Sequence, residues 1–327
     1  MIAGPYGEMS LTTPIVDVEK LIVRYGDFEA VKGITFQVFK GEVFGLLGPN
    51  GAGKSTTINV LSCLLPPAAG SVRIAGFDSL RQRERVKKAI GVVPQDIAVY
   101  PTLSGRENLA FFGRVAGLRG KRLQGRILEV LRIVGLTGQA GQIVEKYSGG
   151  MKRRLNLAIG LIHEPQILFL DEPTAGVDPQ SRNRIFESIE ALRDQGLSVI
   201  YTTHYMEEAE RLCHRVGIMD DGRLIAIDTV KNLVALVGGG IVNLTVTDAS
   251  GAPSILEDLR KLPSIEESSI SDGHIKAKSR NAQRCLLDIL SILERANVGI
   301  TSLEILEPNL ESVFLHLTGK RLRDGDR

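Results

Sequence analysis

The sequence contains few cysteines, no tryptophan and no long apolar run. Cys63, Cys213 and Cys285 lie far apart and show neither metal-ligand spacing nor a disulfide framework. We therefore expect reduced thiols in the cytosol. No stretch approaches the roughly 18 consecutive apolar residues of a transmembrane helix, so we expect any membrane role to require a partner. The first residues lack the basic and apolar segments of a signal peptide, and we expect none.

A large excess of charge of one sign is also lacking. Lysine and arginine together number 40, aspartate and glutamate 38, and the net charge is +2. This balance gives no electrostatic reason to expect a nucleic-acid partner. The hydrophobic content of 43% and the charged content of 24% are ordinary for a globular protein. A chain of 327 residues is long enough for two domains that each bury a core.

The most informative segment spans residues 48–56 and matches the phosphate-binding pattern G-x-x-x-x-G-K-[ST]. An apolar run over 42–47 precedes it, and a helix is predicted over 55–65, ended by Pro66 and Pro67. This strand–loop–helix order lets glycine N–H groups and a helix N-terminus face the phosphates of a nucleotide. The predicted loop residues are Gly48, Pro49, Asn50, Gly51, Ala52, Gly53, Lys54, Ser55 and Thr56.

Four side chains carry the chemistry expected of this loop and of a second apolar strand. We expect Lys54 to reach the β- and γ-phosphates and the Ser55 hydroxyl to ligate Mg²⁺. The second strand, predicted over 166–172, ends in Asp171 and Glu172. Asp171 is then placed to bind Mg²⁺, and Glu172 to orient and deprotonate a water molecule. A helix cap with an exposed neighbour is the structural alternative for this acidic pair, and the phosphate loop upstream disfavours it.

Apolar runs alternate with helical periodicity after the loop, which predicts a mostly parallel sheet. Before the loop, residues 16–23 and 34–39 alternate as antiparallel strands do. Residues 103–134 change to a helical pattern, and we predict a helical subdomain over about 96–150. We also predict an exposed helix over 79–88 and a strand over 90–95. The fold class is therefore α/β, a P-loop NTPase core with an antiparallel β subdomain and an inserted helical subdomain.

The glycine-rich stretch 237–240 predicts a hinge to a second, smaller domain. The order of strand, helix, two strands, helix and strand after it is that of an α+β ferredoxin-like fold, with one inner strand predicted over 264–269. The predicted divisions are an N-terminal extension over 1–14, a nucleotide-binding domain over 15–236, a C-terminal accessory domain over 241–320 and a tail over 321–327.

Another helix start, Ser148-Gly149-Gly150, is on its own a common capped turn. The stretch 147–155, however, resembles the signature motif of ATP-binding cassette (ABC) ATPases. In that family this motif lies just upstream of the strand that carries the paired acids, as it does here. His204 follows the next predicted strand and matches the switch histidine of the family. The resemblance covers residues 16 to about 232.

The resemblance implies ATP as the nucleotide and assigns roles to further residues. Tyr25 would stack on adenine, and Gln95 would sense Mg²⁺ and the attacking water and relay the state to a membrane partner. Asp178 would contact the opposite protomer. The implied catalytic residues are Glu172, His204, Gln95 and Lys54, and the implied metal site consists of Ser55, Gln95 and Asp171.

The signature motif also implies a partner subunit. In the family, Ser148 and Gly150 bind the γ-phosphate of the ATP held by the other protomer, and Gly149 lies between them. This implies a head-to-tail dimer with two ATP molecules at its interface. The chain carries one set of motifs and would pair with itself or with a homologue. Met151 stands where glutamine is commonest, and we expect this change to be tolerated because glycine amides and Ser148 bind the phosphate.

The stretch 307–319 resembles the end motif of ATPases from type-two ABC exporters, which include daunorubicin-resistance-like and nodulation-factor exporters. This branch implies an ATPase subunit on the cytoplasmic face of the cell membrane, which drives a separate transmembrane permease that exports a drug, a lipid or a similar substrate. The alternatives are an importer ATPase of the same family and a soluble ABC ATPase that acts on ribosomes or DNA. The latter usually carries two cassettes or a long coiled-coil insertion, and the sequence has neither.

Overall fold

The computed structural model describes residues 14–247, 252–271, 273–279, 281–296, 298–306 and 308–319. The chain divides into two compact units, the first up to Val230 and the second from Lys231. The predicted tail and nearly all of the predicted N-terminal extension lie outside the described residues. The domain limits proposed from the sequence stay predictions.

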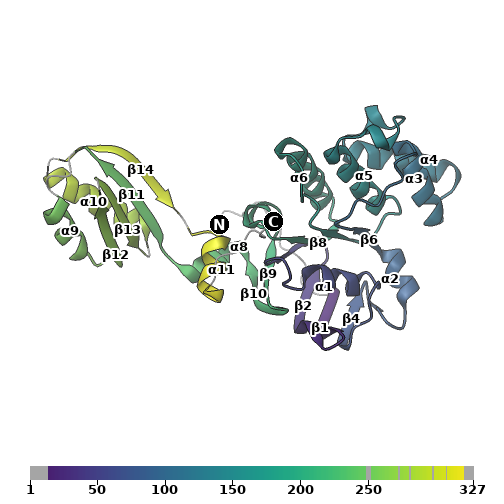
Figure 1. Ribbon diagram of the computed structural model, residues 1–327, viewed down its shortest axis with the longest axis horizontal. Helices are drawn as coiled ribbons and strands as arrows, with labels where there is room; N and C mark the ends of the chain where they lie inside the picture. Colours follow the sequence, from purple (N-terminus) through teal and green to yellow (C-terminus); the bar gives the residue numbers. More distant parts are fainter. Residues whose placement is uncertain are drawn as a thin grey trace, which may run out of the picture. The chain divides into compact units, whose positions relative to one another are not determined.

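The first unit is built on a six-stranded sheet with the order β10-β9-β3-β8-β7-β6 (Figure 1). All neighbouring pairs are parallel except β10 and β9, which form an antiparallel hairpin. Strands β3, β7 and β8 are buried along their whole length, which explains their continuous apolar sequence. The strands are β3 (Val43–Leu47), β6 (Ile90–Val93), β7 (Ile167–Asp171), β8 (Ser198–Thr203), β9 (Arg215–Asp220) and β10 (Arg223–Thr229).

A second, antiparallel sheet has the order β2-β1-β4-β5. Its alternating strands bury one face against the parallel sheet, where Phe36 stacks on Phe44 with ring centroids 5.3 Å apart. The antiparallel subdomain and the mostly parallel sheet confirm the predicted fold class. The strands are β1 (Pro14–Tyr25), β2 (Phe28–Phe39), β4 (Ala69–Ile74) and β5 (Phe77–Asp78).

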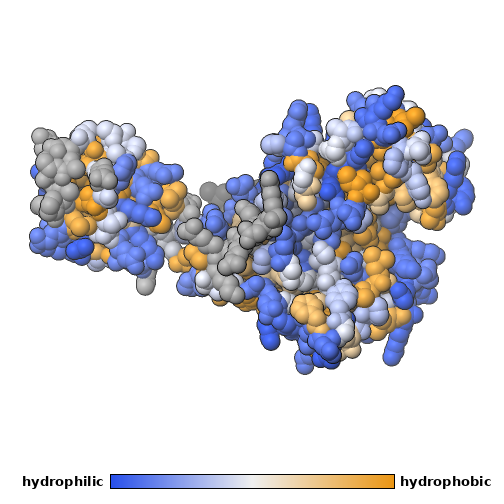
Figure 2. All heavy atoms as spheres, in the orientation of Figure 1, coloured by the Kyte–Doolittle hydropathy of each residue, from blue (hydrophilic) through white to orange (hydrophobic). Residues whose placement is uncertain are grey.

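The helical region contains α3 (Gly105–Val115) and α4 (Gly120–Ile133), which pack with α5 (Gly149–Leu161) around one apolar cluster. Helix α3 starts in a capping box in which Ser104 and Glu107 exchange hydrogen bonds. Hydrophobic residues (orange) appear among the polar ones on the exposed surface of this region (Figure 2). The remaining helices of the first unit are α1 (Lys54–Leu61), α2 (Arg83–Ala89), α6 (Pro179–Asp194) and α7 (Met206–Leu212).

Several predicted element ends in the first unit are wrong. Strand β2 begins at Phe28, not at residue 34. Helix α1 ends at Leu61 because Cys63 adopts a left-handed φ of 59°, which takes the chain out of the helix before the prolines. Helix α2 begins at Arg83, since the Asp78 carboxylate accepts the N–H groups of Leu80 and Arg81 and holds this segment as a turn. Strand β6 ends at Val93, directly before a proline, so Gln95 lies on a loop.

The second unit has a four-stranded antiparallel sheet with the order β12-β13-β11-β14, which is ferredoxin-like, as predicted. Helices α9 and α10 pack on one face around Val242, Leu244 and Ile289. Strand β12 begins at Glu267, later than predicted, and helix α8 was not predicted. The elements are α8 (Val230–Val237), β11 (Gly240–Val246), α9 (Ala252–Arg260), β12 (Glu267–Ser271), β13 (His274–Ser279), α10 (Ala282–Arg295), β14 (Ile300–Leu306) and α11 (Leu310–Thr318).

Candidate nucleotide-binding and catalytic site

The loop between β3 and α1 runs so close to neighbouring backbone that two positions require glycine. A Cβ atom at Gly48 would lie 2.2 Å from the Met219 carbonyl oxygen. At Gly53, φ is +99° and a Cβ atom would lie 2.7 Å from the Ala30 carbonyl oxygen. The two glycines therefore hold the loop against β9 and β2, with the start of α1 directly behind it. This is the geometry that presents backbone N–H groups to an anion.

Lys54 is the first residue of α1, and its side chain folds back over the loop. Nζ donates hydrogen bonds to the carbonyl oxygens of Gly48 at 2.7 Å and Pro49 at 3.0 Å. Nζ also lies 3.2 Å from Glu172 Oε1. Burial lowers the pKa of Lys54, and the nearby carboxylates of Glu172 and Asp171 oppose this shift. The arrangement fixes one cation at the mouth of the loop.

Asp171 and Ser55 bring two oxygen ligands together at the carboxyl end of β7. Ser55 Oγ donates to Asp171 Oδ1 at 3.0 Å, and Thr202 Oγ1 on β8 donates to the same oxygen at 2.7 Å. Among the described residues, no group of three or more His, Cys, Asp or Glu side chains is arranged to hold a metal ion. That finding agrees with Mg²⁺, which usually binds one or two carboxylates and completes its shell with water and phosphate. The donors present therefore fit this ion.

Glu172 follows β7 in a left-handed conformation, with φ of 43°, which is uncommon for a residue that is not glycine. Its N–H donates to Thr202 Oγ1 at 3.0 Å, which fixes the turn. Its Oε2 lies 3.2 Å from His204 Nδ1. Burial raises the pKa of the carboxyl, but the contacts with His204 and Lys54 outweigh it, so the pKa lies below the usual value. Glu172 is therefore held as a carboxylate.

Three of the side chains just described, Lys54, Ser55 and Glu172, line a cleft of about 430 Å³. Tyr25 and Phe28 stand at its entrance, opposite each other across the β1–β2 turn and 49% and 63% exposed. An exposed aromatic pair offers a surface on which a purine can stack. Phe28 was not among the predicted site residues, although its place just after the tight turn at Tyr25 was a usable signal. The lining residues are Tyr25, Phe28, Ala30, Asn50, Gly51, Gly53, Lys54, Ser55, Thr56, Gln95 and Glu172.

The predicted signature residues lie elsewhere. Ser148 caps α5 by accepting the Met151 N–H at 3.2 Å, and Asp178 caps α6 by accepting the Ser181 N–H at 2.9 Å. The two helix starts are adjacent, because a Cβ atom at Gly150 would lie 2.0 Å from Ser181 Oγ. Neither Ser148–Gly150 nor Asp178 is among the described residues that line the cleft. The structure therefore separates the cleft from the adjacent starts of α5 and α6.

Behind His204, a buried carboxylate that the sequence analysis did not identify links the surrounding segments. Glu208 on α7 accepts hydrogen bonds from the hydroxyls of Thr174 at 2.7 Å, Tyr201 at 2.9 Å and Thr203 at 2.7 Å. Thr203 precedes His204, and Thr174 lies in the turn after Glu172. Glu208 therefore fixes the two segments that carry the paired carboxylate and histidine.

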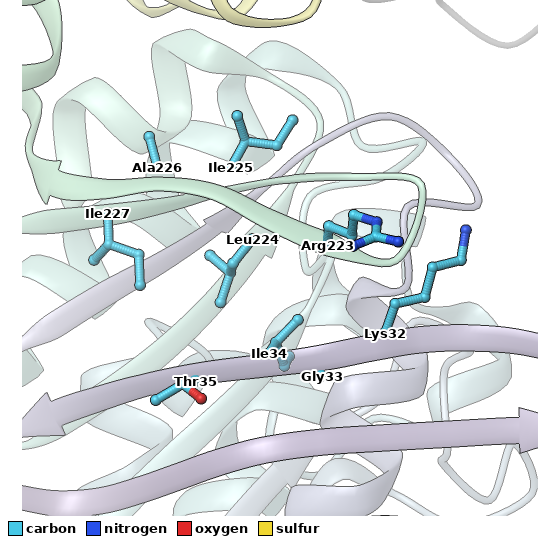
Figure 3. Close-up of a pocket in the computed structure, with 9 residues that line it drawn as sticks. All are labelled: Lys32, Gly33, Ile34, Thr35, Arg223, Leu224, Ile225, Ala226 and Ile227. Atoms are coloured by element: carbon cyan, nitrogen blue, oxygen red, sulfur yellow. The ribbon is translucent and has the colours of Figure 1, made fainter.

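A second pocket, between β2 and β10, is shown in Figure 3. Lys32 joins β2 to the β9–β10 turn, since its N–H donates to the Gly222 carbonyl oxygen at 2.8 Å and its Nζ lies 2.7 Å from Asp221 Oδ2. The pocket contains no residue of the phosphate loop, so it is not part of the nucleotide cleft. Its lining consists of Lys32, Gly33, Ile34, Thr35, Arg223, Leu224, Ile225, Ala226 and Ile227.

Comparisons with known proteins agree with this geometry. A family model described as ABC transporter matches residues 31–175. The linearmycin resistance ATP-binding protein LnrL of Bacillus subtilis (strain 168) is 44% identical over 313 residues, which cover 95% of this chain and 100% of that protein. The daunorubicin resistance ATP-binding protein DrrA2 of Streptomyces coeruleorubidus is 39% identical, with 94% of this chain and 95% of that protein covered.

Nod factor export ATP-binding protein I of Paraburkholderia xenovorans (strain LB400) is 38% identical, with 94% of this chain and 98% of that protein covered. Among solved structures, CbiO1 of Clostridium perfringens, part of an ABC transporter complex, matches with a TM-score of 0.63 and 27% identity over 76% of this chain and 96% of its own. A dimeric ATP-binding cassette in a post-hydrolysis state, bound to ADP and phosphate, matches with a TM-score of 0.59 and 26% identity over 65% of this chain and 98% of its own.

The similarity to these relatives covers 94–95% of the chain, which is more than the nucleotide-binding region alone. None of the described helices is both long and apolar enough to cross a membrane. Both the cassette resemblance and its exporter branch are confirmed. The chain belongs to the ABC transporter family, as an ATP-binding subunit that hydrolyses ATP to ADP and phosphate.

Proposed function

We propose that the chain hydrolyses Mg²⁺-bound ATP in the cleft beside Lys54 and uses the energy to drive a separate permease. This proposal rests on one cluster of side chains. In it, a buried lysine lies close to a hydroxyl and a carboxylate that could bind a metal ion, and to a glutamate paired with a histidine. Bound Mg²⁺ would neutralise charge on the β- and γ-phosphates. Ser55 and Asp171 would hold it, and Gln95, which lines the same cleft, would be the third protein ligand.

The residues of the chain would divide the catalytic work. Glu172, held as a carboxylate, would accept the proton of the attacking water. His204 lies against the other side of this carboxylate and would orient it. Lys54 would exchange its bonds to backbone carbonyls for bonds to phosphate oxygens, which bind a cation more strongly. Tyr25 and Phe28 would stack on the adenine.

The site would be completed by a second subunit, which is either another copy of this chain or a homologue. The start of α5 at Ser148–Gly150 and the Asp178 cap lie outside the cleft of their own chain. In a head-to-tail dimer these helix starts would face the γ-phosphate held by the partner. A related cassette has been solved as a dimer with ADP and phosphate, which supports this arrangement.

The permease would bind in a groove of about 760 Å³ beside the Gln95 loop, and the chain would lie on the cytoplasmic face of the membrane. The floor of the groove includes Pro94, Ala98 and Phe112, and Val115 stands on it 72% exposed. The same groove is also lined by lysine and arginine side chains of α2 and α4. An exposed groove of this mixed character beside the Gln95 loop fits a short amphipathic segment of a partner. The drug-resistance relatives favour export of an amphipathic drug or lipid-like molecule.

Val115→Glu should uncouple the chain from its permease without affecting the isolated ATPase, because it adds a charge to the apolar floor of the groove but lies outside the cleft. The chain would be co-expressed with its permease, and the amount retained on membranes would be measured. We expect at least about a tenfold loss of retention, which corresponds to about 1.4 kcal/mol.

Leu128→Glu is the matched control, since Leu128 is an exposed leucine of the same helical region, 46% accessible, that does not line the groove. It should leave retention unchanged. Equal retention of the Val115 variant and the parent chain would show that the permease binds elsewhere.

A further inference from the structure

Helix α5 grips the Gln95 loop with two buried polar side chains. Arg153 and Asn156 lie three residues apart, on one face of the helix, and are 7% and 2% exposed. Both point at backbone rather than at other side chains. Polar groups this deeply buried are costly unless their bonding partners are well placed.

Their contacts join three segments. Arg153 Nη1 donates to the Gln95 carbonyl oxygen, and Nη2 donates to the Ala175 carbonyl oxygen at 3.1 Å. Asn156 Nδ2 donates to the Pro94 carbonyl oxygen at 3.3 Å, and Asn156 Oδ1 accepts the Ala98 N–H, also at 3.3 Å. The loop is thus held by its main chain at three positions around Gln95.

This attachment leaves the Gln95 side chain itself available. Gln95 lines the nucleotide cleft, while its own carbonyl oxygen accepts a hydrogen bond from Arg153, which does not line the cleft. Helix α5 begins with Ser148, and Ala175 lies three residues before Asp178. The Arg153 guanidinium therefore connects two regions. One is the Gln95 loop, which lines the nucleotide cleft of this chain, and the other is the pair of helix starts, of α5 and α6, proposed to face the partner's nucleotide.

We propose that Arg153 and Asn156 are positioning residues that clamp the Gln95 loop to α5, so that Gln95 and the signature motif move as one body. This inference rests on the proposed function. The groove proposed for the permease is lined by Pro94, Ala98 and Asn156, so a segment bound there lies directly on the clamp. Permease binding and nucleotide binding would then act on the same hydrogen bonds.

The absence of tryptophan allows a specific probe of the loop. Ile97→Trp places the only indole of the full chain on the Gln95 loop, at a side chain that is 36% exposed. In this background, Arg153→Met with Asn156→Leu removes the four clamp bonds. We expect lower fluorescence anisotropy of the indole and loss of its response to Mg²⁺ with a non-hydrolysable ATP analogue. Analogue affinity should stay within about threefold, and kcat should fall by about tenfold or more.

The matched control is Arg126→Met. Arg126 donates to two carbonyl oxygens at the other end of α5, those of Leu161 and Ile162, and touches neither Gln95 nor Ala175. It should leave the anisotropy and the nucleotide response of the indole unchanged. If the double variant fails to fold, Asn156→Asp replaces it. This change keeps the acceptor for the Ala98 N–H but removes the donor to the Pro94 carbonyl oxygen. We then expect a modest decrease of the indole anisotropy below that of the Ile97→Trp parent.

Two results would overturn the clamp. One is that the clamp variant shows the same indole anisotropy, and the same response to Mg²⁺ and the ATP analogue, as the Ile97→Trp parent. The other is the same change in Arg126→Met, which would indicate a general loosening of α5. A parent chain that does not hydrolyse ATP would contradict the proposed function instead, and the anisotropy would still test the clamp.

Discussion

Glu172→Gln is expected to reduce ATP turnover by about a thousandfold, within the range lost when a general base is removed. The amide keeps the size of the carboxylate but cannot accept a proton from water. It also retains an oxygen near Lys54 and a polar group near His204, so the local structure should persist. ATP should then bind without being consumed, and the ATP-bound dimer should accumulate.

Steady-state ATPase rates and size-exclusion chromatography with Mg²⁺ and ATP measure both effects. Glu187→Gln is the control, because Glu187 is an exposed glutamate on α6 and should leave the rate and the elution volume unchanged. If Glu172→Gln hydrolyses ATP normally and stays monomeric with ATP, Glu172 is not the base.

Lys54→Ala is expected to remove most of the affinity for ATP. Two charge-assisted hydrogen bonds to phosphate, at about 1.5–3 kcal/mol each, correspond to a loss of at least about a hundredfold in affinity. The substitution also removes the bonds of Nζ to Gly48 and Pro49, so thermal unfolding should be recorded beside the binding measurement. Isothermal titration calorimetry with ATP gives the affinity directly.

Lys40→Ala provides the comparison, since Lys40 is exposed and lies outside the cleft. It should bind ATP as the parent does. Undiminished ATP binding by a folded Lys54→Ala chain would refute the phosphate-loop assignment.

Much of the nucleotide cleft could be predicted because its chemistry is local in sequence. The loop at 48–56 has fixed spacing, and Asp171 and Glu172 stand at the end of an unmistakably buried strand. Strand order then brings the ends of β3, β7 and β8 together, which places His204 beside Glu172. Parallel strands make this juxtaposition a consequence of topology.

The residues that support the site could not be predicted in the same way. Thr202 matters because its hydroxyl bonds Asp171 and the Glu172 N–H, and Glu208 because three hydroxyls converge on it. Arg153 was visible within the signature stretch, but its bond to Gln95 spans 58 positions of the chain. Contacts of this kind have no periodicity or spacing that a single sequence displays.

The wrong element ends have a similar origin. Helical periodicity continues past Leu61, but the chain leaves the helix at Cys63 and the N–H groups of Leu64 and Leu65 bond back to Asn59. In the second unit, Ser264 donates to Asp288 on α10 and lies before the start of β12. Such local and tertiary bonds override propensity at the ends of elements.

The central claim is that one catalytic site combines the phosphate loop of one subunit with the signature motif of another. Lys54→Ala disables the first half, and Ser148→Arg, which places a bulky cation at the start of α5, disables the second. The decisive measurement is the ATPase rate of an equimolar mixture of the two variants after subunit exchange.

Random pairing gives heterodimers with one complete site, so the mixture should recover about a quarter of the parent rate while each variant alone is inactive. Recovery depends on the two defects lying in different halves of a shared site. A mixture no more active than its separate components would contradict the composite site.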